Sequence, residues 1–297
     1  MSAINNYTDI TAFLVASDVD ISMRFGDFVI FQWDSLKVYN CLDTIPFRKH
    51  FFEITYQQEG HPVKLDHFIF SGEGDKIFFV SPYRLQSCET GGTHSVKGFT
   101  ILFTPEFLHP ATAENYRQRE LYLSDFFSHP ELVLSEKTTA VFSELFSKIH
   151  EEYQQRDNRF SRAIIRHYLQ ILLLLARQYA EPEHTSETAV NNRPQEIYNR
   201  FMNLVQQHSL QESGVKFYAD QMFLTTKHLS TTIKAISGTT ALRIIHHARI
   251  HHAKSLLRQT GSSITEIADA LNFENPDYFS AFFKKHTGIT PLKYRQS

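Results

Sequence analysis

The sequence predicts an α+β protein of two domains, the first built mainly of strands and the second entirely of helices. Up to about Pro130, short apolar runs alternate with turns rich in glycine and proline. From Pro194 onward, apolar residues recur at helical spacing, and part of this region repeats along the chain. A chain of 297 residues is long enough for two domains, each with its own core.

Five strands are expected in the first domain. They are predicted at residues 28–31, 51–56, 67–70, 76–80 and 99–103. Strands of this length, separated by turn residues, are typical of an antiparallel sandwich or a small barrel. Most of the aromatic residues in these strands are expected in the core. If the strands enclose a cavity, the inward-facing aromatic residues would line it for a small ligand.

The pattern becomes helical between residues 107 and 180. The helix expected at 161–180 is apolar on more than one face, because Ile171, Leu173 and Leu174 stand beside its main apolar stripe. A helix that is apolar on two sides needs two partners. We expect one partner to be the strand domain and the other to be the same helix of a second subunit. Burial within one monomer is the alternative.

Residues 181–195 are polar, bounded by proline and without periodicity, which predicts a linker between domains at 1–180 and 196–297. Charge is divided between the two sides. Residues 194–297 hold 12 Lys and Arg against 7 Asp and Glu, a net charge of +5, and the rest of the chain holds 18 against 25, a net charge of −7. This asymmetry is expected when only the second domain meets phosphates.

Composition excludes several classes of protein. The longest apolar run, residues 171–176, is too short to span a bilayer, and the N-terminus lacks the pattern of an export signal. Two cysteines form no disulfide framework, so we expect a cytoplasmic protein without a membrane partner. Neither a glycine-rich phosphate loop nor a nucleophile elbow occurs, which argues against an NTPase or a hydrolase.

Residues 264–295 predict two short helices joined by a tight turn, the arrangement of a helix-turn-helix unit. Asn272 suits a left-handed turn, Asn275 can cap the second helix, and Pro276 suits its first position. Gly288 is expected to end that helix. The residues expected in the core of the unit are Ile264, Ile267, Ala268, Leu271, Phe279, Phe282 and Phe283.

An internal repeat predicts a second such unit. At an offset of 50, residues Thr225, Leu229, Ile233, Lys234, Gly238, Thr240 and Leu242 recur as Asn275, Phe279, Phe283, Lys284, Gly288, Thr290 and Leu292. Ala219 and Met222 recur at an offset of 49, so the two turns differ by one residue. The span 241–258 between the units is expected to form one helix of about 27 Å. Such a rod would set the spacing of the two units.

The stretch from Arg249 to Arg295 resembles the C-terminal signature of AraC-type transcriptional regulators. The matching residues are Arg249, Ala253, Leu256, Leu257, Ile264, Ile267, Ala268, Phe273, Tyr278, Phe279, Ser280, Phe283, Lys284, Gly288, Pro291, Tyr294 and Arg295. Two positions depart from it. Asn272 stands where the family often has glycine, and Ala281 stands where it often has arginine, with Thr231 at the corresponding place of the first unit. Without arginine at Ala281 and Thr231, we do not expect arginine-to-guanine contacts at these two places, whereas the DNA-binding role is still expected.

The resemblance implies a sequence-specific DNA-binding regulator of transcription, with double-stranded DNA and RNA polymerase as partners. It also implies a cupin-like barrel or sandwich as an N-terminal sensor and dimerisation domain for an unidentified small effector. The residues expected to face DNA are Thr226, Lys227, Ser230, Thr231, Lys234, Pro276, Asp277, Ser280, Ala281, Lys284 and Lys285. We expect Lys227 near base edges, and Lys284 and Lys285 on phosphates.

The alternative is a cupin-like metal-dependent enzyme with a helical appendage. Metal-dependent cupins use clustered histidine and glutamate ligands, whereas His50, Glu53, His61, His67 and His94 are scattered here. We therefore expect neither a metal nor another cofactor, and no catalytic residue. His246, His247, His251 and His252 include pairs four residues apart, but Lys and Arg surround them. We expect these histidines to be solvated or to face phosphates.

Overall fold

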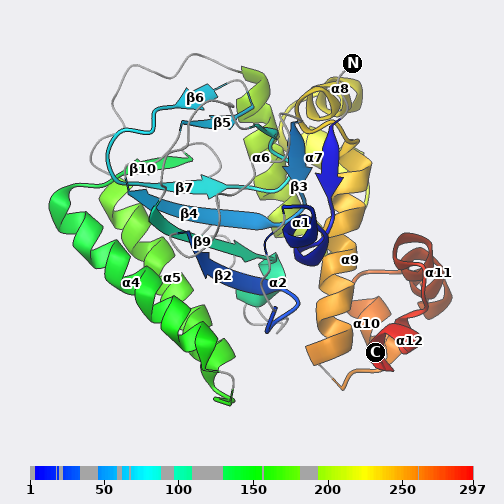
Figure 1. Cartoon of the computed structure of the whole chain (residues 1–297). Coiled ribbons are helices and arrows are strands. Elements are labelled where there is room, and N and C mark those ends of the chain that lie inside the picture. The colour runs from blue at the N-terminus through cyan, green and yellow to red at the C-terminus, as the bar shows by residue number, and fades with distance from the viewer. Residues whose placement is uncertain are drawn as a thin grey trace. The chain divides into compact units, whose positions relative to one another are not determined.

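The computed structural model describes residues 4–17, 19, 23–33, 46–58, 62–66, 68–87, 97–108, 130–155, 157–180, 193–259 and 261–296. The described residues up to 180 form one compact unit, and those from 193 onward form another (Figure 1). Most of the predicted linker, residues 181–192, lies outside the described residues. Its last three residues begin a helix, because α6 starts at Arg193.

Two five-stranded sheets build the N-terminal unit. The first has the order β1-β3-β8-β5-β6, and the second has the order β10-β7-β4-β9-β2. The strands of the first sheet are β1 (Asn5–Tyr7), β3 (Phe47–Lys49), β5 (Val63–Leu65), β6 (Phe68–Phe70) and β8 (Gln86–Ser87). Those of the second are β2 (Phe28–Gln32), β4 (Phe52–Gln58), β7 (Lys76–Val80), β9 (Lys97–Phe103) and β10 (Glu131–Val133).

All pairings are antiparallel apart from the parallel pair β1 and β3. The five predicted strands are confirmed as β2, β4, β6, β7 and β9. The described strands remain in two separate sheets, so they do not form the closed barrel that was one of the expected arrangements. The short helices that the structure describes in this unit are α1 (Ile10–Ala16) and α2 (Pro105–Leu108).

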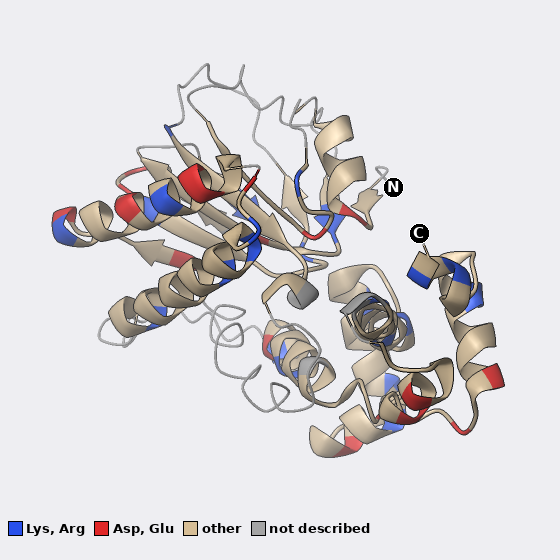
Figure 2. Cartoon of the chain, turned by 90° about the horizontal axis from the view of Figure 1, so that it is seen from below, with Lys and Arg blue, Asp and Glu red and all other residues tan. Residues whose placement is uncertain are grey.

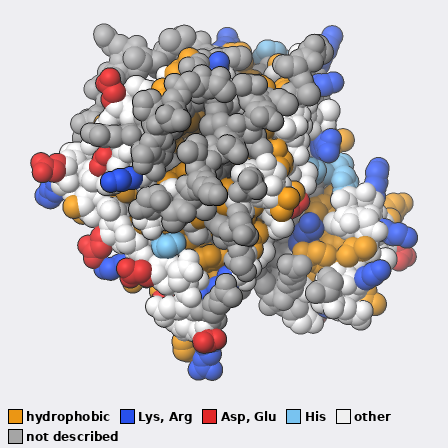
Figure 3. Space-filling model, viewed as in Figure 1, with side chains coloured by type: hydrophobic (Ala, Val, Ile, Leu, Met, Phe, Trp, Pro, Cys, Tyr) orange, Lys and Arg blue, Asp and Glu red, His pale blue; other side chains and the backbone are white. Residues whose placement is uncertain are grey.

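The central strand β4 divides the N-terminal unit into two environments. Two long helices, α4 (Glu136–Gln154) and α5 (Ser161–Ala180), cover one face of its sheet. On that face the Tyr56 ring stacks on Phe146 of α4, with ring centres 5.5 Å apart. Side chains alternate along a strand, so Glu53 and Thr55 point the other way, toward the first sheet. The solvent side of α4 carries charges of both signs (Figure 3).

Helix α5 has the predicted bounds, 161–180, but only part of the predicted second apolar face. Leu173 is buried in the unit, so the expectation that it belongs to a free face is wrong. Ile171 and Leu174 are 44% and 48% exposed. These two side chains, three residues apart, form an outward apolar ridge on α5. None of the described helices is long and apolar enough to cross a membrane.

The described part of the C-terminal unit is entirely helical. Its helices are α6 (Arg193–His208), α7 (Val215–Gln221), α8 (Thr226–Ser237), α9 (Ala241–Gln259), α10 (Ile264–Ala270), α11 (Pro276–Thr287) and α12 (Pro291–Gln296). Helix α6 was not predicted. It packs against α7, α8 and α9 and so adds a wall to the first helix-turn-helix unit.

Gly98 lets β9 approach the central strand β4. Its φ is +149°, and a Cβ there would overlap the backbone carbonyl of Tyr56. We expect Gly98→Ala to lower the free energy of unfolding by at least ~2 kcal/mol, because strain and the clash add. Urea unfolding followed by the fluorescence of Trp33, the single tryptophan, would measure this loss.

The matched control is Gly74→Ala. Gly74 has a φ of +74°, but no atom lies within 4 Å of its Cβ position. Only the left-handed backbone is strained there, which costs about 1–2 kcal/mol. Equal losses for the two alanine variants would contradict the close approach of β9 to β4.

Candidate nucleic-acid interface

Two helix-turn-helix units follow one another in the C-terminal unit, α7–α8 and α10–α11. Both turns place a non-glycine residue in the left-handed region, Phe223 with φ 56° and Asn272 with φ 53°. These two residues are 49 positions apart. The helix caps that follow are 50 positions apart: Thr225 accepts from the His228 N–H, and Asn275 accepts from the Tyr278 N–H. The predicted repeat, with one extra residue in the second turn, is confirmed.

The two recognition helices, α8 and α11, share their ends and their buried faces. Each ends at a left-handed glycine, Gly238 with φ 71° and Gly288 with φ 82°. Fully buried residues lie at equivalent places, namely Leu229 and Ile233 on α8 and Phe279 and Phe283 on α11. The outward faces of the two helices must therefore correspond as well.

The predicted DNA-facing residues all lie on these two helices, and none of them is buried. Exposed are Thr226, Lys227, Thr231 and Lys234 on α8, and Asp277, Ala281, Lys284 and Lys285 on α11; partly buried are Ser230, Pro276 and Ser280. Ser230, Thr231 and Lys234 also line an open groove of about 400 Å³ with Ala235 and Thr240. Figure 2 shows the Lys and Arg residues along the chain in blue and the Asp and Glu residues in red.

Two further outward residues were missed as candidates. Tyr278 is 62% exposed in the first turn of α11, and His228 is exposed at the equivalent place on α8. Each lies next to predicted DNA-facing residues. These two residues are 50 positions apart, so the repeat itself could have identified them as an equivalent pair on the two recognition helices.

Arg249, in the middle of α9, joins the segment after α6 to the second helix-turn-helix unit. Only 2% of it is exposed. Its guanidinium donates to the Ser209 and Leu210 carbonyls at 2.8 Å each and to the Leu271 carbonyl at 2.5 Å. It also lies 4.6 Å from the centre of the Phe273 ring. A planar cation with several fixed donors suits such a site better than an ammonium group does.

The sequence contained a signal for this role. Arg249 lies four residues after Ile245 and four before Ala253, and both of those are fully buried. An arginine in line with a buried apolar stripe of a helix is expected to be either paired or hydrogen-bonded. The partners themselves could not be read from the sequence, because they lie 40, 39 and 22 residues away.

The expectation that the histidines of α9 are solvated or face phosphates is wrong for two of them. His252 is 8% exposed and contacts the Ser209 hydroxyl at 3.3 Å. The His246 ring packs against Phe282 and His286 of α11, with ring centres 5.2 Å and 5.1 Å away. Among the described residues, no group of three or more His, Cys, Asp or Glu could hold a metal ion.

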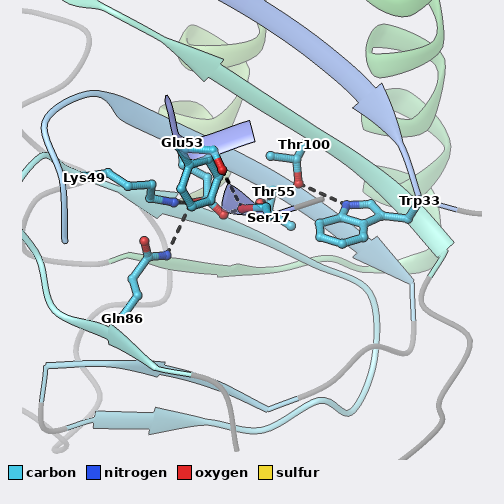
Figure 4. A network of polar contacts seen from close by, with 8 residues as sticks. Ser17, Trp33, Lys49, Glu53, Thr55, Gln86 and Thr100 are labelled. Atoms are coloured by element: carbon cyan, nitrogen blue, oxygen red, sulfur yellow. Dashed lines mark hydrogen bonds and ion pairs between the residues drawn. The ribbon is translucent and has the colours of Figure 1, made fainter. Parts of the chain in front are cut away.

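A polar network lies between the two sheets of the N-terminal unit (Figure 4). Lys49 is buried and forms an ion pair with Glu53. The Glu53 carboxylate also accepts from the Thr55 hydroxyl at 2.8 Å and from the Gln86 amide at 3.3 Å. The buried Gln86 Oε1 atom has no hydrogen-bond partner among the described residues.

The scattered residues considered as cupin metal ligands take other roles where the structure describes them. The His50 ring packs on Tyr83, with centres 4.6 Å apart, and Glu53 pairs with Lys49. His61, His67 and His94 lie outside the described residues. No described contact favours the alternative of a metal-dependent enzyme.

Comparisons with known proteins concern mainly the C-terminal unit. A family model described as a helix-turn-helix domain matches residues 218–297. The chain is 30% identical over 129 residues to the HTH-type transcriptional activator RhaS of Salmonella schwarzengrund, covering 43% of this chain and 44% of RhaS. It is 42% identical over 69 residues to the bifunctional transcriptional activator/DNA repair enzyme AdaA of Bacillus subtilis, covering 23% of this chain and 33% of AdaA.

Among solved structures, the chain is similar to the C-terminal domain of AraT, a response regulator from Geobacillus stearothermophilus. The identity is 30%, the TM-score is 0.33, and the match covers 34% of this chain and 84% of that one. The chain thus spans less than half the length of the two full-length relatives. Tandem units joined by one long helix, together with the matched region, define a helix-turn-helix domain. This domain belongs to the AraC/XylS family of transcriptional regulators, as the signature in residues 249–295 indicated.

The contact of His246 with α11 makes the unit sensitive to acid. Burial, together with the charges of His286, Arg249 and Lys285, lowers the pKa of His246 from 6.5 to about 4. Between these values the unfolded chain binds more protons than the folded chain. The free energy of unfolding should therefore fall as the pH decreases from about 6.5 toward about 4.

His246→Phe keeps a ring against Phe282 and removes the titration, so its stability should fall less over this pH range. Denaturant unfolding followed by far-UV circular dichroism at several pH values would measure the difference. His228→Phe is the control, because His228 is exposed on α8. A parent and a His246→Phe variant with equal pH slopes would contradict the assignment.

Proposed function

We propose that this chain is a sequence-specific DNA-binding regulator of transcription. The observation that carries the proposal is the repeated helix-turn-helix unit with two outward recognition helices, α8 and α11. The 19 residues of α9 between them give a rod of ~28 Å. This length is a little under the ~34 Å between successive major-groove faces on one side of B-DNA. The similarity to RhaS, described as a transcriptional activator, supports the proposal.

The two recognition helices have different tasks in this proposal. On α8, the exposed Lys227 and Thr231 contact base edges, and Lys234, beside the groove with Thr240, contacts a phosphate. On α11, Asp277 and Ala281 are poor donors to bases. The second helix therefore reads sequence weakly and binds mainly through phosphate contacts of Lys284 and Lys285. The interface is completed by Thr226 and Ser230 on α8 and by Pro276 and Ser280 on α11. RNA polymerase is a further proposed partner.

The N-terminal unit is proposed to sense a small effector and to dimerise. Charged and polar groups between two sheets are costly to bury. The ion pair of Lys49 and Glu53 lies beside the Gln86 acceptor, to which no described residue donates, and supports a binding role for this interior. We infer no enzymatic role. The domain boundaries at 1–180, 181–195 and 196–297 are part of the same proposal.

The affinity of the full chain for DNA should come largely from electrostatic attraction to the phosphates. Duplexes selected from a random pool should bind with a log affinity that falls linearly as the log of the salt concentration rises.

Lys227→Ala should relax preference at one or two base pairs by ~1–3 kcal/mol, because a base-edge contact is lost. Lys284→Ala should weaken all sequences alike and reduce the salt slope by about one.

A panel of single-base-pair changes in the selected site measures both effects. The control is Lys137→Ala, which removes an exposed lysine on α4 of the other unit and should leave binding unchanged. If no duplex is bound even at low salt, the proposed function is wrong. If Lys284→Ala changes base preference and Lys227→Ala does not, the two roles are assigned the wrong way round.

Dimerisation should depend on the ridge of Ile171 and Leu174. In the full chain, the double change Ile171→Lys and Leu174→Lys should convert dimers into monomers without unfolding, because both residues are partly exposed. Sedimentation velocity would measure the change. Val15→Lys, at a 76% exposed valine on α1, is the control and should remain dimeric. A double variant that stays dimeric would overturn this assignment.

A further inference from the structure

We infer that the segment Ser209–Glu212, here called the strap, fixes the rotation of the two helix-turn-helix units about α9 and so sets the spacing of DNA half-sites that they accept. Arg249 and Asn272 are the positioning residues that hold the strap. The inference rests on the proposed DNA binding. According to this inference, the accepted spacing of DNA half-sites is determined by contacts that lie away from both recognition helices.

Each backbone carbonyl of the strap accepts a hydrogen bond from a side chain of another element. Arg249 of α9 binds the first two carbonyls. The Asn272 amide, in the second turn, donates to the Gln211 carbonyl at 3.0 Å. The Tyr218 hydroxyl, on α7, donates to the Glu212 carbonyl at 2.9 Å. The strap is thus held by the first unit, the second unit and the helix between them.

The strap also contributes to the core of the second unit. Leu210 packs against the buried cluster of that unit, which consists of Ile250, Ala253, Leu257, Ile267, Ala268, Leu271, Phe279 and Phe283. Leu210 precedes the first unit in the chain. Its side chain therefore couples the start of the first unit to the interior of the second.

A rod alone cannot supply this constraint. Helix α9 fixes the distance between the two units along its axis. It does not by itself prevent one unit from rotating about that axis relative to the other. Arg249 prevents this rotation because one guanidinium binds the strap on one side and the Leu271 carbonyl, at the end of α10, on the other. On B-DNA, each added base pair moves the second half-site by ~3.4 Å and rotates it by about 34°. A fixed rotation between the units should therefore accept one spacing.

The two turns give an internal comparison. Phe223 and Asn272 have nearly the same left-handed φ, at equivalent places of the two units. Phe223 is 91% exposed, whereas the Asn272 side chain binds the strap. The two residues thus allow a matched test of the strap contact, because a glycine adopts either turn without strain.

The test measures affinity of the full chain for duplexes whose two half-sites have the selected spacing, one base pair less, one more and two more. The parent should lose at least ~10-fold in affinity for one added or removed base pair, equivalent to about 1.4 kcal/mol. Asn272→Gly keeps the turn but removes the strap bond. Arg249→Lys keeps the charge but loses the fork that binds three carbonyls. In both variants this penalty should shrink to less than ~3-fold, with weaker binding at the selected spacing.

Phe223→Gly is the control and should keep the spacing profile of the parent. A merely structural role of the strap would weaken binding at all spacings equally and leave their ratio unchanged. An unchanged ratio in Asn272→Gly, with the protein folded and bound to DNA, overturns the inference even if Arg249→Lys does not fold. Failure of the parent to bind any duplex overturns the proposed function instead.

Discussion

The C-terminal unit depends on the burial of one cation. Removing a charge from water costs several kcal/mol unless hydrogen bonds compensate. The Arg249 guanidinium finds its acceptors at the carbonyl ends of two helices: the Ser209 and Leu210 carbonyls follow α6, and the Leu271 carbonyl ends α10. Unpaired carbonyls at helix C-termini carry partial negative charge and need donors. One arginine thus satisfies two helix ends, so neither end can move without exposing the cation.

Features governed by neighbouring residues could be predicted from the sequence. The cap at Asn275, the left-handed Asn272 and the terminal Gly288 obey rules that act within about one helical turn, and the structure has each of them. Long-range partners could not be predicted. The strap bonds of Arg249 and Asn272 join residues 39 to 61 positions apart. Strands of two or three residues, such as β3 and β8, are too short to show an alternation.

The N-terminal unit shows a different limit of sequence interpretation. Along β4, Phe52, Ile54 and Tyr56 alternate with polar residues, a pattern that usually indicates one buried and one solvated face. Here the polar face meets a second sheet, and the partly buried Glu53 contacts Lys49 and Gln86. Alternation indicates which residues share a face, but not what covers that face. Aromatic residues are nevertheless buried on both sides of the sheet: Tyr56 stacks on Phe146 of α4, and Phe78 of β7 packs against Phe70 of the first sheet.

The unequal recognition helices give the strap its significance. A second helix with Asp277 and Ala281 on its outer face contributes few base contacts of its own, and its lysines would bind any phosphate backbone. Free attachment would let that helix bind wherever phosphates lie, adding affinity without discrimination. Attachment in a fixed rotation makes its phosphate contacts available only when the first helix lies in one register. Rigid coupling through Arg249 and Asn272 thus turns sequence-independent contacts into part of the specificity of the whole domain.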